Sequence, residues 1–328
     1  MSKKHTPVDY SVDPHLTPLV KAFLDVLNSG GPPVESLDTE GARNVLVNAQ
    51  KSVKVDVSGV TVSEKTITAD GYTIPLHIMK PEGATGTLPV FMFIHGGGWI
   101  LGDFPTHQRL MRDLVVLSGF ASVFVNYTRT PDAAYPQAIN EIYAATKWVA
   151  ENGAEIGVDG KNLAIAGNSV GGNMSTVTCL LAKERGGPEI KFQLLMWPIV
   201  DSDFDTKSYR KFGTQRFLTK SLMSWMYDMY IPDPEKRKDI HASPNQATVE
   251  QLKGLPPALI QVAENDILRD EGEAYGRKLA EAGVTVTTIR YIGVIHDWGM
   301  LNGLAHLPET KSLVEHGAAE LKKYLGPK

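Results

Sequence analysis

The stretch Gly167-Asn168-Ser169-Val170-Gly171-Gly172 directly follows the apolar run Leu163-Ala164-Ile165-Ala166 and precedes a helical pattern over residues 173–183. It is a G-x-S-x-G segment between an expected strand and an expected helix. A serine on such a sharp turn is pushed out of the packed layers, and its hydroxyl stands free at the carboxyl end of the strand. The flanking glycines let backbone segments pass where a Cβ would clash. A solvated serine in a glycine-rich turn fits the same letters, so the rest of the chain has to decide.

Hydrophobic periodicity predicts how strands and helices follow one another along the chain. From residue 88 on, strands alternate with helices, and this order predicts an α/β fold with a mostly parallel sheet covered on both faces. Strands are predicted over residues 53–57, 72–79, 90–94, 121–127, 163–166, 192–197, 258–262 and 284–291. Helices are predicted over residues 16–27, 37–49, 109–117, 142–151, 173–183, 273–282 and 311–324.

Two helical regions lie outside this alternation, and we expect them to form a cap on one domain that spans residues 1–328. The first is residues 1–50, and the second is the insertion 201–251, which is rich in large side chains. The insertion follows the end of a strand, where α/β proteins place their ligand crevices. A packing subdomain without substrate contact is the alternative interpretation.

The composition excludes several classes of protein. The 328 residues are 42% hydrophobic and 21% charged, with a net charge of −4, so no basic excess favours nucleic acid. The sequence contains no apolar stretch of about 18 residues, so no membrane span is predicted. The one cysteine, Cys179, excludes an internal disulfide, and we expect it to be a small buried hydrophobic residue. Because no secretory signal is visible, we expect a cytoplasmic protein.

A nucleophilic serine needs a base, usually a histidine held by a carboxylate, and after a turn of this kind both follow it in the chain. His296 follows the strand expected to end near Tyr291 and opens a loop, which makes it the best base. A loop histidine bonded to backbone is the alternative. His306 and His316 lie in or near the last helix and are expected on the surface, whereas His241 lies in the insertion and is a weaker candidate.

The acid is expected at the end of the strand before that histidine. Asp266 is the best placed, and Glu264 is its main rival. Asp270 precedes a helix and is predicted to be its N-cap. A carboxylate here would fix the histidine tautomer and stabilise the imidazolium.

The segment His95-Gly96-Gly97-Gly98-Trp99 follows another expected strand. Consecutive glycines can turn successive backbone N–H groups toward one point, where a developing oxyanion would be stabilised, and the N–H of Val170 would join them. We expect His95 and Gly98 to shape this loop. A phosphate cradle is the alternative, but no phosphate-binding motif such as GxxxxGK[ST] occurs. The sequence contains no HExxH motif, no close pair of histidines and no cluster of cysteines, so no metal site is predicted.

These motifs, together with residues 127–136, resemble the hormone-sensitive-lipase-like (bacterial family IV) carboxylesterases of the α/β-hydrolase superfamily over most of the chain. The resemblance implies hydrolysis of small or medium carboxylic esters without a cofactor, and pairing of two copies through the sheet edge. It implies Ser169 as nucleophile, Asp266 as acid, His296 as base, and Gly96, Gly97 and Val170 as oxyanion donors. We also expect Trp99, Phe217 and Trp225 to line the substrate pocket.

The chain departs from that family's usual pattern at several positions. Asn168 stands where Asp is usual, Val170 where Ala is usual, and Ile267 where Pro is usual. Asp297 and Trp298 replace a usual Gly-Phe. Asn168 removes a negative charge beside the serine, and Val170 adds bulk that is expected to narrow the acyl pocket. No catalytic group is lost, but the departures leave the substrate open.

Two other functions fit parts of the pattern. Residues 95–99 are also similar to the HGGxW segment of arylformamidases, in which case the bond that is cut would be an amide. Some proteins similar to this family bind a small ligand and have lost the base, but Ser169, Asp266 and His296 are all present here. A lipase for long chains is less favoured, because no broad amphipathic helix suited to a membrane surface is visible.

Overall fold

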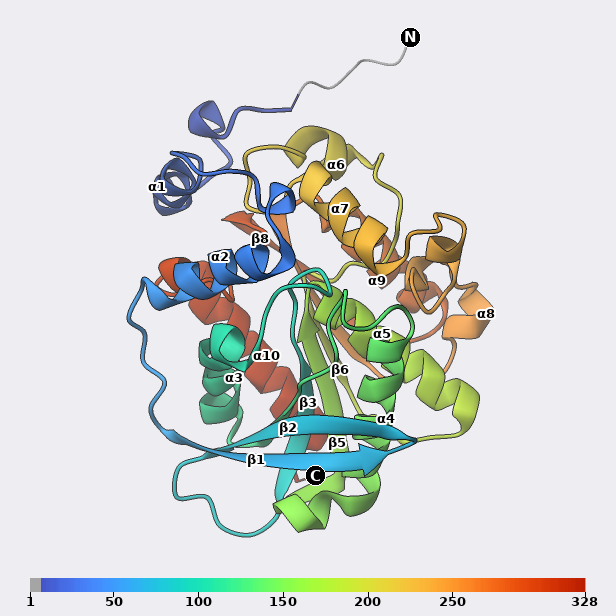
Figure 1. The fold of residues 1–328 in the computed structure, drawn as a ribbon. Helices are drawn as coiled ribbons and strands as arrows, with labels where there is room; N and C mark the ends of the chain where they lie inside the picture. The colour runs from blue at the N-terminus through green and yellow to red at the C-terminus, as the bar shows by residue number, and fades with distance from the viewer. Residues whose placement is uncertain (1–6, 328) are drawn as a thin grey trace.

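The computed structural model describes residues 7–327 and is built around one eight-stranded sheet (Figure 1). Its strands are β1 (Val60–Ala69), β2 (Tyr72–Pro81), β3 (Leu88–Ile94), β4 (Ala121–Val125), β5 (Val158–Asn168), β6 (Gln193–Met196), β7 (Ala258–Asn265) and β8 (Val286–Ile295). Their spatial order is β1-β2-β4-β3-β5-β6-β7-β8. The β1–β2 and β2–β4 pairs are antiparallel, and all the others are parallel. The predicted mostly parallel sheet is confirmed.

Helices cover both faces of this sheet, as the continuous apolar runs of its central strands require. The α-helices of residues 7–327 are α1 (Pro18–Leu27), α2 (Thr39–Lys51), α3 (Phe104–Ser118), α4 (Gln137–Asn152), α5 (Val170–Arg185), α6 (Lys207–Phe212), α7 (Lys220–Tyr230), α8 (Val249–Leu252), α9 (Arg269–Glu281) and α10 (Pro308–Leu325). Helices α3 and α10 pack together on one face, and α4 and α5 pack together on the other (Figure 1). Between residues 7 and 327, no helix combines the length and apolar composition that a membrane span requires.

The predicted strand over residues 53–57 is wrong, because that segment is a loop and the first strand begins at Val60. The Asp56 carboxylate accepts a hydrogen bond from the Ser58 N–H at 2.9 Å, and Gly59 follows with a φ of 80°. These turns interrupt the extended backbone at residues 56–59, and the segment before them pairs with no strand of residues 7–327. The predicted turn at Asp70 and Gly71 is confirmed, with φ values of 48° and 85° between β1 and β2.

The two segments that we expected to form a cap lie side by side above the carboxyl ends of the parallel strands (Figure 1). Residues 1–6 of the first segment lie outside the described residues. The Asp13 carboxylate pairs with the Arg216 guanidinium at 2.6 Å, and both side chains are 1% exposed. A second bond joins the Asn28 amide to the Gln215 carbonyl at 3.2 Å. Because a buried charge is costly without its partner, separating residues 7–50 from the insertion at this ion pair would be unfavourable.

Candidate active site

Ser169 occupies a strained turn between the last residue of β5 and the first residue of α5. Its φ of 54° and ψ of −121° are rare for a residue with a side chain. Glycine is required on both sides. A Cβ on Gly167 would overlap the Gly171 carbonyl oxygen, and a Cβ on Gly171 would overlap the Ile94 carbonyl oxygen of β3. The turn therefore holds the Ser169 hydroxyl at the edge of the sheet, beneath residues 7–50 and 201–251.

The structure brings Ser169, His296 and Asp266 into one hydrogen-bonded row. The His296 Nε2 lies 3.1 Å from the Ser169 Oγ, and the His296 Nδ1 lies 2.7 Å from the Asp266 Oδ2. The other carboxylate oxygen of Asp266 accepts from the Leu268 N–H at 3.0 Å. With Nδ1–H given to the carboxylate, the Nε2 lone pair faces the serine, as proton removal requires. The residues meet because β5, β7 and β8 run parallel in one sheet, so their carboxyl ends lie on the same side of it.

The rival acids are held elsewhere. The Glu264 carboxylate binds the His15 ring at 3.1 Å and the Gly293 N–H at 2.9 Å, and it makes no bond to His296. Asp270 is not the N-cap of α9, contrary to the prediction. The helix begins at Arg269 and has Leu268 as its N-cap, so Asp270 lies inside its first turn. Its carboxylate instead accepts from the Ser208 N–H at 2.9 Å.

The rival bases are also elsewhere. His241 lies near two carboxylates, with its Nε2 3.0 Å from Glu184 and its Nδ1 3.2 Å from Asp239. His306 is exposed, as expected, and His316 is half-buried on α10. None of the three lines the cavity at Ser169.

The expected set of oxyanion donors changes at Gly96, which is already bonded, and at Gly98, which was expected only to shape the loop. The Gly96 N–H donates to the Asn168 Oδ1 at 3.0 Å and is therefore not free for substrate. Gly97 and Gly98, with φ values of 109° and 63°, line the cavity beside Ser169. Within residues 7–327, no hydrogen bond uses their N–H groups. The Val170 N–H lies in the first turn of α5, where N–H groups have no intrahelical partner. The available donors are therefore Gly97, Gly98 and Val170.

His95, at the start of the same loop, is buried and takes no part in the row of Ser169, His296 and Asp266. Its ring stacks on that of Tyr127 with a centroid distance of 4.3 Å. Its Nδ1 lies 2.7 Å from the Gly96 carbonyl oxygen. These contacts fix the backbone that leads into Gly97, which suits a residue that shapes the loop.

A small cavity of ≈ 110 Å³ opens onto Ser169. Apart from Ser169, His296 and Asp297, the side chains that line it are apolar, and most come from residues 7–50 and 201–251. Phe217, one of the three expected pocket residues, lines the cavity, and its ring lies 6.5 Å from that of His296. The cavity is thus suited to a small apolar molecule whose reacting group faces the serine.

Trp99 and Trp225 do not line this cavity, so the prediction was wrong for both. Trp99 is 1% exposed and stacks on Tyr230 at 4.3 Å, which places its ring inside the packed interior. Trp225 lies on another face of α7 than Met223 and Met226, which do line the cavity. Val170 is fully buried and does not line the cavity either, so it does not narrow it directly.

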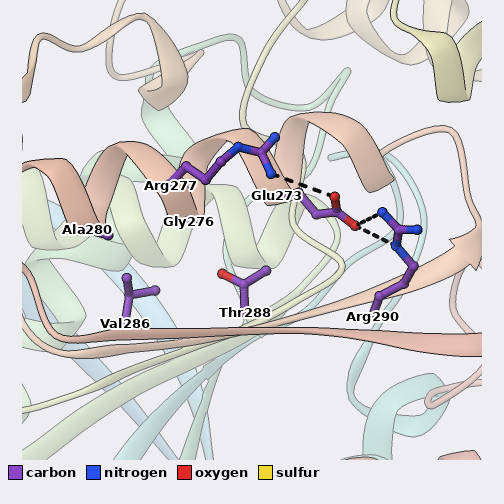
Figure 2. A pocket seen from close by; sticks show the side chains of 7 residues that line it. All are labelled: Glu273, Gly276, Arg277, Ala280, Val286, Thr288 and Arg290. Atoms are coloured by element: carbon purple, nitrogen blue, oxygen red, sulfur yellow. Dashed lines mark hydrogen bonds and ion pairs between the residues drawn. The ribbon is translucent and has the colours of Figure 1, made fainter.

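A larger groove of ≈ 550 Å³ lies away from Ser169, between α9 and the edge strand β8 (Figure 2). Its charged side chains are paired with one another, since Glu273 binds Arg290 at 2.6 Å and lies 3.8 Å from Arg277. The groove contains no serine, histidine or cysteine. Its one hydroxyl, that of Thr288, has no histidine in the groove to activate it, so the chemistry belongs to the smaller cavity.

The pKa of His296 is set by opposing effects. Burial lowers it, whereas the negative charges of Asp266 and Asp297 and the hydrogen bond to Asp266 raise it, and the net result is a pKa above the ordinary value of 6.5. The acid form of the histidine is therefore stabilised, which favours proton uptake from a nearby hydroxyl. The unprotonated form, which acts as a base, predominates only above this raised pKa.

We therefore expect kcat/KM for an aryl ester to rise with pH through a midpoint above the ordinary histidine pKa of 6.5. The reason is that kcat/KM reports the ionisation of the free protein, in which His296 must be neutral to accept a proton. Initial rates measured across pH, with the Ser169→Ala variant as the blank for spontaneous hydrolysis, give this midpoint. A midpoint well below 6.5 would contradict the electrostatic account of His296.

A serine on a strand–turn–helix elbow, followed in the chain by an acid and a histidine at the same edge of a mostly parallel sheet, defines an α/β-hydrolase. Residues 91–300 match a family model described as an alpha/beta hydrolase fold. The chain therefore belongs to this family, and within it to the hormone-sensitive-lipase-like esterases that its motifs indicated.

The relatives of the chain support this placement over nearly its whole length. An esterase structure from Pseudomonas putida is 56% identical, with a TM-score of 0.95, and the match covers 96% of this chain and 99% of that one. Carboxylesterase NlhH of Mycobacterium tuberculosis is 32% identical over 95% of this chain and 97% of its own length. An ethyl acetate hydrolase from Pseudomonas putida is 29% identical over 86% of this chain and 92% of its own.

Proposed function

We propose that the protein is a serine carboxylesterase that hydrolyses small to medium acyl esters through an acyl-enzyme. The observation that carries the proposal is the row of hydrogen bonds from Asp266 through His296 to Ser169, at 2.7 and 3.1 Å. Relatives named as esterases over nearly the whole chain support it. A fluorophosphonate probe tests it directly, because the probe reacts with an activated serine and peptide mapping identifies the residue labelled.

The geometry supports the following sequence of steps. The Ser169 Oγ attacks the ester carbonyl carbon while the His296 Nε2 takes its proton, and the N–H groups of Gly97, Gly98 and Val170 stabilise the oxyanion. The carbon–oxygen bond of the ester then breaks, and His296 returns the proton to the leaving alcohol. Water, deprotonated by His296, next attacks the acyl-enzyme, and the acid leaves as Ser169 is protonated again. Asp266 stabilises the imidazolium in both halves.

The lining of the cavity supports short apolar acyl groups as substrate. Residues 7–50 and 201–251 together close the space above Ser169, and in this proposal they act as the cap over the substrate. Burial of each further methylene of the acyl chain is worth about 0.8 kcal/mol only while the cavity still has room. Beyond that length the chain has to displace packed side chains, which is costly.

An acyl-length series of p-nitrophenyl esters, from acetate to decanoate, measures this limit. We expect kcat/KM to be highest among the shortest esters and to fall by roughly tenfold or more at decanoate. Met223→Ala, which enlarges the cavity, should move the optimum to longer chains. Met229→Ala, on the same helix but outside the lining, is the matched control and should leave the optimum unchanged. A maximum at decanoate in the parent protein would contradict the proposed substrate range.

The same assay distinguishes an ester substrate from an amide. N-Formylkynurenine is the test substrate for arylformamidase activity, and we expect it to be a much poorer substrate than the short esters. A strong preference for it would overturn the substrate class while leaving the nucleophile in place.

Two further properties are proposed, each from a single feature of the chain. We propose that two copies pair through β8, which ends the sheet on one side and exposes 60% of Ile292. Light scattering after size exclusion tests this pairing.

A cytoplasmic location is proposed from the single cysteine, Cys179, which is buried in α5 and free.

A further inference from the structure

Asp297 places a second buried carboxylate beside the proposed base. It is 4% exposed and has a φ of 60°, a conformation that costs free energy in a residue with a side chain. Its Oδ1 accepts hydrogen bonds from the Trp197 Nε1 at 2.6 Å and from the Asn168 Nδ2 at 3.1 Å. Its Oδ2 lies 3.8 Å from the His296 Nε2, the ring nitrogen that faces Ser169. Asp266 contacts the other nitrogen of the same ring.

Asn168 connects this carboxylate to the oxyanion loop. Its amide nitrogen donates to Asp297, and its amide oxygen accepts from the Gly96 N–H at 3.0 Å. Gly96 directly precedes Gly97 and Gly98, whose N–H groups are the proposed oxyanion donors. A continuous path of hydrogen bonds thus runs from Asp297 through Asn168 to the loop that must hold the oxyanion.

The contact between the two side chains needs one hydrogen-bond donor and one acceptor. An amide has a donor and an acceptor, whereas an ionised carboxylate only accepts. With a second aspartate in place of Asn168, two carboxylates would face each other at hydrogen-bond distance, so one of them would have to take up a proton or move away. The amide of Asn168 and the carboxylate of Asp297 are therefore complementary to each other.

We propose that Asn168 and Asp297 act as a matched pair that positions the oxyanion loop and supplies the second negative charge that His296 meets when it is protonated. Asp297 is a positioning residue in this proposal, since it acts on substrate through Asn168, Gly96 and His296. The inference rests on the proposed function, because it assigns a task within the same esterase site.

The charged and titratable groups around the pair are few. His296 meets two carboxylates, Asp266 and Asp297, which lie at the two sides of its ring. Asp297 also interacts electrostatically with His107 of α3. Asp266 in turn interacts electrostatically with Glu271 of α9 and Tyr209 of α6. Removing the charge of Asp297 therefore takes away one of the two carboxylates that favour the protonated ring.

A double-variant cycle of Asn168→Asp, Asp297→Asn and the two together tests the pair. Asn168→Asp alone should lower kcat for p-nitrophenyl acetate by roughly tenfold or more with little change in KM, because the oxyanion loop acts in the transition state. The double variant again has one amide and one carboxylate, with the two positions exchanged. The amide introduced by Asp297→Asn can donate through its Nδ2 to the carboxylate introduced by Asn168→Asp, which still accepts from the Gly96 N–H. Because the Asp297 Oδ1 accepts from both the Trp197 Nε1 and the Asn168 Nδ2, the new amide has to turn so that its oxygen stays with Trp197. The double variant should therefore recover part of the lost kcat.

Asp297→Asn alone provides a readout that a purely structural role would not move. It should shift the acid limb of kcat/KM to lower pH, because His296 loses one of its two carboxylates. Asp159→Asn, which removes a carboxylate at the opposite end of β5, is the control and should leave the limb in place. Asn168→Ala should lower kcat and should not be rescued by Asp297→Asn, because neither hydrogen bond can then be remade.

The inference is overturned if Asn168→Asp keeps full kcat, if the double variant is no better than Asn168→Asp, or if the acid limb of Asp297→Asn does not move. Thermal melting of each variant separates these results from a failure to fold. The proposed function is judged separately by labelling and turnover of the parent protein. An esterase that labels at Ser169 but shows no rescue would refute the pair alone.

Discussion

Replacing Ser169 by Ala is expected to lower kcat/KM for p-nitrophenyl acetate by about 10⁴-fold or more. The variant keeps the oxyanion donors and the cavity but has no atom to form the acyl-enzyme, so only slow attack by water remains. Fluorophosphonate labelling should disappear in the same variant. Steady-state rates at one pH, with thermal melting to show that the fold is intact, provide the measurement.

Ser175→Ala is the matched control for this result. Ser175 is a buried serine on α5, six residues after Ser169, but its hydroxyl donates to the Gly171 carbonyl at 2.7 Å and does not line the cavity. Its replacement should leave most of the activity and all of the labelling. If Ser169→Ala stays fully active, or if the two variants lose activity equally, the assignment of the nucleophile is wrong.

Replacing Gly171 by Ala is expected to destabilise the fold by about 3 kcal/mol or more, a large effect for one methyl group. The added Cβ would overlap the Ile94 carbonyl oxygen, and it would also lie 2.9 Å from the His95 carbonyl carbon. Both contacts are with backbone, so no side chain can turn aside to relieve them. The strand that leads to the oxyanion loop and the helix that follows Ser169 would have to separate.

The Gly171→Ala effect is measured by urea denaturation against Gly30→Ala, which has open space around the added Cβ and an ordinary φ. The control should change the free energy of unfolding by less than about 1 kcal/mol. Esterase activity of the soluble Gly171→Ala fraction should fall together with its stability. A soluble variant with unchanged stability and activity would show that the close packing of this turn is not required.

The sequence was sufficient to predict the parts of the site that follow from order and position along the strands. Ser169, Asp266 and His296 each come within a few residues of the end of an expected strand. Because parallel strands end on the same side of a sheet, their meeting could be predicted without coordinates. The alternation after residue 88 likewise predicted the sheet correctly. In contrast, residues 53–57 were predicted to form a strand but have no strand of the described chain beside them to pair with. Alternation of apolar and polar residues alone does not show whether such a partner exists.

Other features depended on contacts that no local pattern contains. The Gly96 N–H was expected to bind the oxyanion, but the Asn168 side chain, 72 positions later, uses it. Trp99 and Trp225 were expected at the pocket. Trp99 instead packs against other aromatic side chains, and Trp225 lies on another face of its helix. Asn168 and Asp297 both depart from the family's usual residues, but their contact joins residues 129 positions apart, which no local pattern reveals.

The ion pair between Asp13 and Arg216 also bears on how the molecule is made. The two residues are 203 positions apart, so Asp13 leaves the ribosome long before its partner exists. At a synthesis rate of about 5–20 residues per second, the N-terminal segment waits roughly 10 to 40 s for Arg216. Its final packing is therefore a late event during synthesis, and the cavity above Ser169 closes only after most of the chain has been made.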